Sequence, residues 1–306
     1  MLKKKIIFLV GPTAIGKSAI AIHLAKKIDA EIISCDSMQV YSLMDIVTSQ
    51  PSSTQRKQIK HHLLGVVNPI REYNVARYRK EAIAICDKLF LKGKIPLFVG
   101  GSGLYYSVII DGLFPAIGED KSIRARLDKE LSLKGSSCLF QRLSKVDPLS
   151  AKKIHPNDSR RIIRALEVYL KTGLPMSSLQ KNRIGLGSEY EIKIFALNAN
   201  RKTIYNKIDQ RVDKMFKTGL INEVQGLLRL KLSKTAFCAI GIRELESYFK
   251  GEYDLDEARR LIKRNSRHYA KRQLTWFKKD ARIHWVNIKD EETPGEIAKR
   301  IWKKLF

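Results

Sequence analysis

The sequence predicts an α/β protein with a parallel sheet at its core and an all-helical insertion in the middle of the chain. Short apolar runs alternate with helical patterns through the first third of the chain, as the βα units of a parallel sheet do. Between about 114 and 190 the strand-like runs vanish, and helical segments separated by glycine and proline take their place. A strand pattern returns at about 191. We therefore expect one core made of residues 1–113 and 191–306, with a helical insertion at 114–190.

Hydrophobic periodicity places the individual elements in order. In the first part of the core we expect strands near 5–10, 31–34 and 96–99, and helices at about 17–28 and 74–91. In the insertion we expect helices at about 122–133, 136–145, 147–154 and 158–171. In the second part of the core we expect a strand at 191–197, helices at about 201–217, 219–229, 242–250 and 255–279, a strand at 284–288 and a final helix.

The charge balance of the 306 residues favours a polyanionic partner. Lys and Arg number 58 against 31 Asp and Glu, which leaves a formal net charge of +27. Such an excess is typical of proteins that bind nucleic acid, although a lysine-rich proteome would produce it as well. The four cysteines show no C-x-x-C spacing, so we expect reduced intracellular thiols rather than a zinc site or disulfides.

Neither a membrane span nor a signal peptide is expected. No apolar stretch has the length that a membrane-spanning helix needs. The basic start of the chain is followed by only a short apolar run at 6–10, which suits a strand and not the apolar segment of a signal peptide. We expect a cytoplasmic protein, monomeric and without a membrane partner.

The loop after the first strand reads Gly11-Pro12-Thr13-Ala14-Ile15-Gly16-Lys17-Ser18. A strand before it and a helix after it make this G-x-x-x-x-G-K-[ST] pattern a P-loop, and the core P-loop NTPase-like. The glycines let backbone amides turn toward phosphate oxygens, and the helix N-terminus adds the positive end of its dipole. We expect Lys17 to contact the terminal phosphate and Ser18 to offer its hydroxyl to Mg²⁺.

Two further residues stand where they could act on a ligand of this loop. Asp36 follows the second strand, and ligands of open α/β sheets bind beyond the carboxyl ends of the strands. Its carboxylate could be a general base, a partner of Mg²⁺ or a helix N-cap. Arg211, on the predicted helix 201–217, could stabilise a leaving phosphate or form a surface salt bridge. A second glycine-rich loop, at 100–105, should face the same crevice.

Basic side chains gather at two places. Arg160, Arg161 and Arg164 share one face of a predicted helix in the insertion, which suits a phosphate, a base edge or a merely solvated face. Residues 258–279 contain no acidic residue, and we expect their basic face, with no carboxylate on the same helix, to be a polyanion surface.

Two smaller expectations complete the survey. The other face of helix 255–279 should lie in the core, and its members are Ala258, Leu261, Ile262, Tyr269 and Trp276. The adjacent His61 and His62 would face opposite ways on a strand, so one metal site that uses both is not expected.

Several short blocks follow the P-loop in a characteristic order. They are Ser34-Cys35-Asp36-Ser37-Met38-Gln39-Val40-Tyr41, Val99-Gly100-Gly101-Ser102-Gly103-Leu104-Tyr105, His155-Pro156-Asn157-Asp158, Arg161-Ile162-Ile163-Arg164-Ala165-Leu166-Glu167-Val168, Arg211-Val212-Asp213-Lys214-Met215, Ala239-Ile240-Gly241, Lys271-Arg272-Gln273 and Thr275-Trp276-Phe277. In this order they resemble the bacterial tRNA dimethylallyltransferases, over nearly the whole chain. The resemblance implies an enzyme that transfers the dimethylallyl group of dimethylallyl diphosphate to N6 of the adenosine just 3′ of the tRNA anticodon (position 37).

The resemblance also implies roles for the matching residues. Gly11 to Ser18 with Arg211 would hold the diphosphate of dimethylallyl diphosphate rather than ATP, with Mg²⁺ on Ser18. Asp36 would be the base on the N6 amine, and Lys17, Arg211 and Ser102 would complete the catalytic group. The residues expected to contact the anticodon stem-loop of tRNA are Asp36, Ser37, Met38, Gln39, Ser102, Arg124, Arg160, Arg161, Arg164, Gly241, Ile242, Arg243, Lys271 and Arg272.

Some positions depart from the family pattern. Ser102 stands for a usual Thr and keeps the hydroxyl, Arg160 replaces a usual Gln, Ile242 a usual Tyr, and Gly65 an acidic residue. Two rival functions stay open at this point. A small-molecule P-loop kinase explains Lys17 and Asp36 but not the charge of +27, and a non-catalytic RNA-binding module explains the charge but gives Asp36 no task.

Overall fold

The computed structural model describes residues 4–113 and 117–305. The chain divides into two compact units: one runs to Ile110 and resumes at Glu189, and the other is Asp111 to Ser188. The insertion expected from the sequence, 114–190, has nearly the same extent as the second unit. Within the described residues, no helix is long and apolar enough to cross a membrane.

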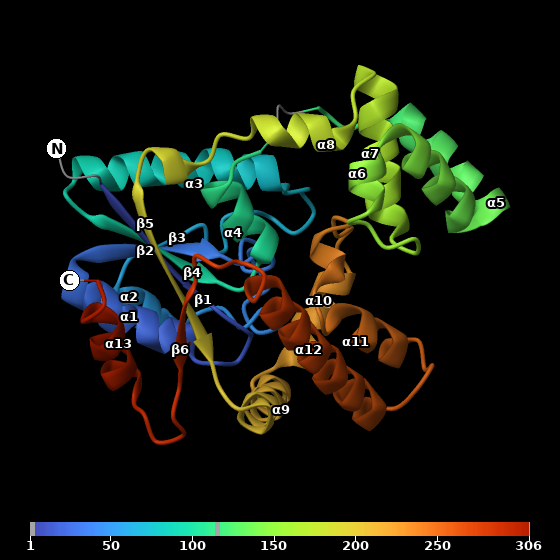
Figure 1. The fold of residues 1–306 in the computed structure, drawn as a ribbon. Helices are drawn as coiled ribbons and strands as arrows, with labels where there is room; N and C mark the ends of the chain where they lie inside the picture. The colour runs from blue at the N-terminus through green and yellow to red at the C-terminus, as the bar shows by residue number, and fades with distance from the viewer. Residues whose placement is uncertain (1–3, 114–116, 306) are drawn as a thin grey trace. The chain divides into compact units, whose positions relative to one another are not determined.

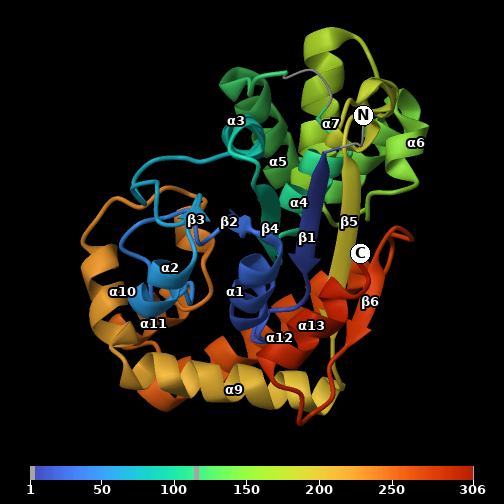
Figure 2. The same ribbon diagram turned by 90° about the vertical axis from the view of Figure 1, so that its left-hand side faces the viewer.

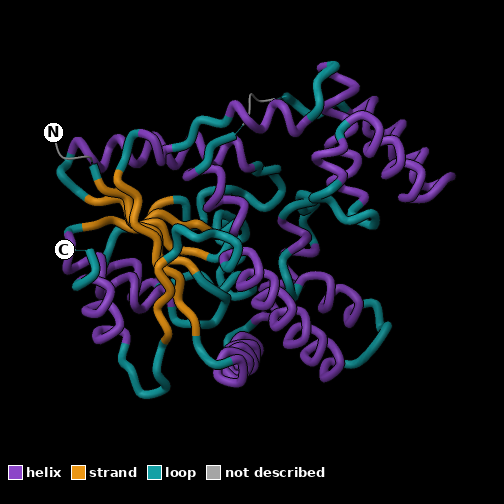
Figure 3. The backbone as a smooth tube through the Cα atoms, viewed as in Figure 1, coloured by secondary structure: helices purple, strands orange, loops and turns teal. Residues whose placement is uncertain are grey.

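A parallel sheet of six strands forms the centre of the first unit (Figure 1). The strand order is β3-β2-β4-β1-β5-β6, and every neighbouring pair is parallel. The strands are β1 (Lys5–Val10), β2 (Ala30–Cys35), β3 (His61–His62), β4 (Ile95–Gly100), β5 (Glu191–Asn198) and β6 (His284–Asn287). This confirms the predicted α/β class, and Figure 3 shows the strands of the sheet together with helices around them.

Helices cover both faces of this sheet (Figures 1 and 2). One face carries α1 (Lys17–Ile28) and α13 (Pro294–Trp302), and the other carries α3 (Val75–Leu91) and α4 (Gly103–Ile110). Crossover connections between parallel strands are right-handed, so β1 to β2 and β2 to β4, which travel in opposite directions across the sheet, place their helices on opposite faces. The P-loop is thereby fixed between the sheet and α1.

Aromatic rings fill the core between the sheet and the helices α4 and α12 (Leu255–Phe277). Phe8 of β1 stacks on Phe98 of β4 with ring centroids 4.6 Å apart, and Tyr106 meets Phe8 edge to face. Phe277 meets Tyr106 in the same way at 5.6 Å. These buried rings anchor the C-terminal end of α12 to the sheet. This end of the helix lies near the two glycine loops.

Two short helices of the first unit were not expected from the sequence. The first, α2 (Ser53–Gln58), lies in the stretch read as polar loop and is held by a capping box between Ser52 and Gln55. The second is α4, in which five of eight residues are buried. A helix that is apolar on most sides has no 3.6-residue alternation, so periodicity cannot reveal it.

The C-terminal helices of the first unit correct two expectations about residues 258–279. These helices are α9 (Arg201–Lys217), α10 (Leu220–Leu228), α11 (Ile242–Phe249) and α12. Trp276 was expected in the core but is 40% exposed, and Phe277 occupies the buried position. The basic face of α12 is also partly neutralised, because Arg259 and Arg260 pair with Asp256 and Glu257 of its own first turn.

The second unit is helical, as predicted. Its helices are α5 (Lys121–Val146), α6 (Pro148–Ala151), α7 (Ser159–Thr172) and α8 (Met176–Leu179), of which α8 was not expected. The two helices predicted at 122–133 and 136–145 are the halves of α5, which breaks at Gly135 with φ 75° and ψ 172°. Leu127, Leu139 and Leu143 of α5 pack with Ile162 and Leu166 of α7 in one apolar cluster.

A buried carboxylate organises one side of this helical unit. Glu167 of α7 is fully buried and accepts hydrogen bonds from the Asp120 amide (2.8 Å), from Arg124 (3.0 and 3.1 Å) and from Arg164 (2.7 Å). Burial alone would raise the pKa of Glu167, but these hydrogen bonds outweigh it and hold the pKa below its ordinary value. Two of the arginines expected at RNA are thus already bound to one carboxylate.

Candidate active site

The P-loop joins β1 to α1 and wraps its lysine inward. Gly11 (φ 143°) and Gly16 (φ 97°) adopt backbone angles that L side chains avoid, and a Cβ on Gly11 would stand 2.9 Å from the carbonyl oxygen of Leu197. The Lys17 ammonium donates hydrogen bonds to the carbonyl oxygens of Gly11 (2.9 Å) and Pro12 (2.8 Å). These two hydrogen bonds hold the Lys17 side chain against the backbone of the P-loop.

Two cations and one carboxylate face the hollow above this loop. Burial lowers the pKa of Lys17 to about 8, the negative charge of Asp36 opposes that fall, and the positive charge of Arg211 adds to it. Burial likewise lowers the pKa of Arg211, again opposed by Asp36. The Nε of Arg211 is buried, and within the described part of the chain it has no hydrogen-bond partner. A hollow with two desolvated cations and an unpartnered guanidinium nitrogen suits a multiply charged anion.

Asp36 stands at the carboxyl end of β2 and lines the hollow as well. Its Oδ1 accepts the amides of Met38 (2.9 Å) and Gln39 (3.4 Å), which fixes the turn that follows. The helix N-cap interpretation does not apply as stated, because residues 37–40 form a turn and no helix begins there. The carboxylate is thereby oriented by its own backbone while it borders the hollow.

Ser102 connects the second glycine loop to that turn. Its hydroxyl accepts the Ser37 amide at 2.9 Å and lies 3.1 Å from the Ser37 hydroxyl. The Ser102 amide in turn donates to the carbonyl of Cys35 at 3.1 Å. At Gly100 a Cβ would stand only 2.0 Å from that same carbonyl oxygen. Close backbone approach at a glycine therefore brings the ends of β2 and β4 together.

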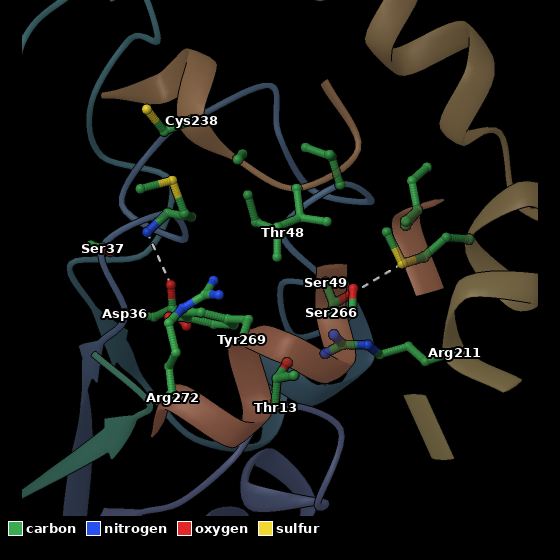
Figure 4. A pocket seen from close by; sticks show the side chains of 16 residues that line it. Thr13, Asp36, Ser37, Thr48, Ser49, Arg211, Cys238, Ser266, Tyr269 and Arg272 are labelled. Carbon is green, nitrogen blue, oxygen red and sulfur yellow. Dashed lines mark hydrogen bonds between the residues drawn. The ribbon is translucent and has the colours of Figure 1, made fainter. Parts of the chain in front are cut away.

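A second hollow of about 220 Å³ adjoins the first and shares Thr13, Asp36, Thr48, Ser49 and Arg211 with it. Figure 4 shows Asp36, Tyr269 and Arg272 grouped on one side of this pocket and Arg211 reaching in from α9 on the other. The apolar part of its wall consists of Met38, Val47, Met215, Ala239, Ile240 and Ile262. The lining of the first hollow thus suits an anion, the second hollow has a partly apolar wall, and Asp36 and Arg211 line both.

The segment that carries Val47 is fastened by a residue that sequence reasoning missed. Glu223 of α10 accepts the amides of Ile46 (2.8 Å) and Val47 (2.7 Å). Nothing in the sequence around Glu223 indicates this partner, which lies far away along the chain. An acidic residue in the first turn of α10 is normally read as a helix-dipole partner.

Gln273 is the second functional residue that sequence reasoning missed. This buried side chain of α12 accepts the Thr13 amide at 2.8 Å and donates to the Gly101 carbonyl at 2.9 Å. A Cβ at Gly101 would stand 2.0 Å from the Gln273 amide nitrogen. One side-chain amide therefore bridges the P-loop and the second glycine loop and fixes their relative position. In the sequence, Gln273 is only the uncharged residue after Lys271 and Arg272, which indicates neither its burial nor its two partners.

The residues expected to contact RNA lie in several places. Around the pocket are the turn of Ser37 to Gln39, Ser102 and the exposed Arg272. Gly241 (φ 112°) starts α11, Ile242 is fully buried, and exposed Arg243 lies over the Phe237 ring. Lys271 is exposed on another side of α12, and it borders a separate hollow.

The remaining candidates belong to the helical unit. Arg124 and Arg164 are bound to Glu167, Arg161 pairs with Asp158 at 3.1 Å, and Arg160 is exposed. The three arginines of α7 thus differ in environment although they lie close together along the helix. Their contact with RNA stays a prediction.

In the part of the chain that the structure describes, metal-binding side chains do not cluster. Among residues 4–113 and 117–305, no cluster of three or more His, Cys, Asp or Glu side chains could hold one. His62 is 2.7 Å from Glu31, and His61 bonds to the Ile59 carbonyl, so the two histidines have separate partners. Ser18 and Asp36 both border the P-loop hollow, a donor set that fits Mg²⁺, which commonly takes one or two protein oxygens and completes its shell with phosphate oxygens and water.

Comparison with known proteins gives a consistent result. The family described as IPP transferase matches residues 39–280, and the one described as isopentenyl transferase matches residues 4–66. The tRNA dimethylallyltransferase of Carboxydothermus hydrogenoformans is 45% identical over 98% of this chain and 97% of that protein. The enzyme of the same name from Thermotoga maritima is 42% identical over 99% and 98%.

Solved structures agree with the sequence relatives. The tRNA isopentenylpyrophosphate transferase of Bacillus halodurans superposes with a TM-score of 0.72 at 36% identity, covering 99% of this chain and 97% of that one. A eukaryotic dimethylallyltransferase described as acting on tRNA superposes with a TM-score of 0.81 at 28% identity, covering 98% of this chain and 77% of that one.

The bridge made by Gln273 leads to a stability and binding test. Gln273→Ala should leave the Thr13 amide and the Gly101 carbonyl without partners, at a cost of about 1–3 kcal/mol of unfolding free energy. It should also weaken binding of inorganic diphosphate, measured by calorimetry, because the P-loop loses its support. The exposed Gln225→Ala on α10 is the control and should change neither quantity. Wild-type diphosphate affinity in Gln273→Ala would show that the P-loop holds its shape without the bridge.

Proposed function

This chain belongs to the IPP transferase family, and we propose that it transfers a dimethylallyl group from dimethylallyl diphosphate to N6 of adenosine 37 of tRNA. The observation that carries the proposal is the border position of Asp36 and Arg211. Both residues line the anion hollow over the P-loop and also the adjoining apolar pocket. A substrate with a diphosphate at one end and a branched hydrocarbon at the other has the same two-part character.

In the proposed reaction the C1–O bond of dimethylallyl diphosphate breaks, and diphosphate leaves with the electron pair. Lys17, Arg211 and the loop amides would stabilise the developing charge, and each preorganised donor of this kind contributes about 3–4 kcal/mol. Bound Mg²⁺, held by Ser18 and the diphosphate with Asp36 nearby, would add positive charge at the same place. The apolar wall would exclude water from the allylic carbon.

The new bond forms between C1 and N6 of adenine, and the amine then loses a proton. The lone pair of this amine is delocalised into the ring, so a carboxylate that accepts the proton assists the attack. Asp36 is the carboxylate shared by both hollows, which supports this role. The adenine must leave its stack to reach the pocket, and single-stranded loops are where RNA bases can do so.

The direct test of this function uses substrate competition. Protein incubated with a tRNA anticodon arm and labelled dimethylallyl diphosphate should transfer label to the RNA. An arm with guanosine in place of adenosine 37, which has no N6 amine, should stay unlabelled. Phosphoryl transfer from ATP to a small molecule, without any label in the RNA, would instead establish the kinase alternative.

Asp36→Asn should lower single-turnover transfer by roughly 10²- to 10⁴-fold, because the amide keeps the size of the side chain but cannot accept the proton. Affinity for the anticodon arm should change little. Asp45→Asn, which alters an exposed carboxylate paired with Arg56, is the matched control and should transfer at the wild-type rate. A wild-type single-turnover rate in Asp36→Asn would leave Asp36 with a purely structural role in its turn.

Diphosphate binding should depend on pH through Lys17. Because the pKa of Lys17 is about 8, the ammonium is present below that pH, and affinity should decline as pH rises through it. Arg211→Gln removes a charge that lowers this pKa, so the decline should move to higher pH. Asp36→Asn removes a charge that raises it, so the decline should move to lower pH. Calorimetry across pH tests this, since the ionisation of the ligand is common to all variants, and shifts of the same sign in both would contradict the assignment.

A further inference from the structure

The helices α9 and α12 lie side by side in the first unit (Figure 2). Two ion pairs join them: Lys263 with Asp213 at 2.7 Å, and Arg267 with Asp209 at 3.0 Å for its Nε. As the partner advances four residues along α12, it retreats four residues along α9. The helices are therefore antiparallel. At each of these two successive turns, one cation of α12 pairs with one carboxylate of α9.

The next turn breaks this charge pattern. Four residues beyond Arg267 stands Lys271, and four residues before Asp209 stands Tyr205, which carries no charge. Both line a hollow of about 320 Å³. Arg201 and Lys278 border the same hollow, and no carboxylate lines it. Within the part of the chain that the structure describes, none of the three cations forms an ion pair.

The composition of the hollow indicates what it can hold. Ile204, Ala270 and Leu274 give it an apolar floor, and the Arg201 guanidinium lies 5.1 Å from the centre of the Tyr205 ring. The amide of Asn198 is already bonded to Asn287 at 3.1 Å. The charged rim therefore offers three positive groups that repel one another, with no fixed hydrogen-bonding pattern for a base. An anion bound at the rim would relieve that repulsion.

We propose that this hollow binds a backbone phosphate of the RNA substrate, as a contact separate from the reaction pocket; the proposal rests on the proposed function. The hollow shares no lining residue with either of the two hollows at the P-loop. Arg272 lines the reaction pocket, and Lys271 lines this one. Neighbouring residues of a helix point about 100° apart, and a helix with its side chains is about 10–12 Å wide. One RNA strand passing over α12 can thus place a nucleotide in the pocket and a flanking phosphate in the hollow.

The test is a salt titration of RNA binding by fluorescence anisotropy. The triple variant Arg201→Gln, Lys271→Gln and Lys278→Gln is compared with wild type on a tRNA anticodon arm. Each phosphate neutralised in single-stranded RNA contributes about 0.7 to the slope of log affinity against log salt, so loss of this one phosphate contact in the triple variant should reduce the slope by about 0.7. The control Lys88→Gln, Lys299→Gln and Lys303→Gln removes the same charge from exposed positions without ion pairs and should keep the wild-type slope.

Each outcome decides the proposal. A wild-type slope in the hollow variant, or an equal loss in the control, would overturn it. Thermal stabilisation by inorganic phosphate or AMP that disappears in the hollow variant, with no change in RNA binding, would assign the site to a free anion. Retained stabilisation by inorganic diphosphate shows that the variant is folded and its P-loop intact. Failure of dimethylallyl transfer by the wild-type protein would overturn the proposed function, whereas the slope reports the hollow by itself.

Discussion

The side-chain amide of Gln273 holds together the two backbone loops on which the site is built. One end of the amide receives the Thr13 amide of the P-loop, and the other end donates to Gly101 of the second glycine loop. The arrangement requires glycine at position 101, where a Cβ would overlap the Gln273 side chain. It also requires a fixed α12, which the buried ring of Phe277 attaches to the sheet. Packing in the core thus sets the geometry of the anion site through one hydrogen-bonded side chain.

The cations of the first unit fall into two groups, those paired with a carboxylate of the protein and those with few carboxylates near them. Where α12 packs against α9, its cations Lys263 and Arg267 each form an ion pair with a carboxylate of α9. At the hollow over the P-loop, which Lys17 and Arg211 line, and at the hollow that Lys271 and Arg201 line, the cations have few or no carboxylates beside them. The net charge of +27 thus includes cations at these two hollows for which the protein supplies little or no countercharge.

The sequence was sufficient for the features that depend on local pattern. Alternating strands and helices predict the sheet, and the spacing of Gly11, Gly16 and Lys17 predicts the P-loop. Both patterns consist of residues that are close together in the sequence. The bridges of Gln273 and Glu223 could not be predicted, since each joins backbone groups that are distant in sequence. The error at Trp276 has a related cause: its ring packs against Gly103, and a residue without a side chain leaves the indole 40% exposed. The prediction for the basic face of α12 could not include the carboxylates of α9, because the sequence does not show that the two helices pack against each other.

The carboxylate of Glu167 links residues that substitution would otherwise treat as independent. Arg124 and Arg164 approach it from two helices, and the backbone amide of Asp120 completes its coordination. A change at either arginine leaves a buried negative charge under-compensated. A change at the glutamate removes the acceptor that the two guanidinium groups share, and leaves Arg124 with Glu119 and Arg164 with the Ile117 carbonyl. Accepted changes in relatives should therefore occur at these positions as correlated sets, and the helical unit should diverge in sequence around a conserved ionic triad.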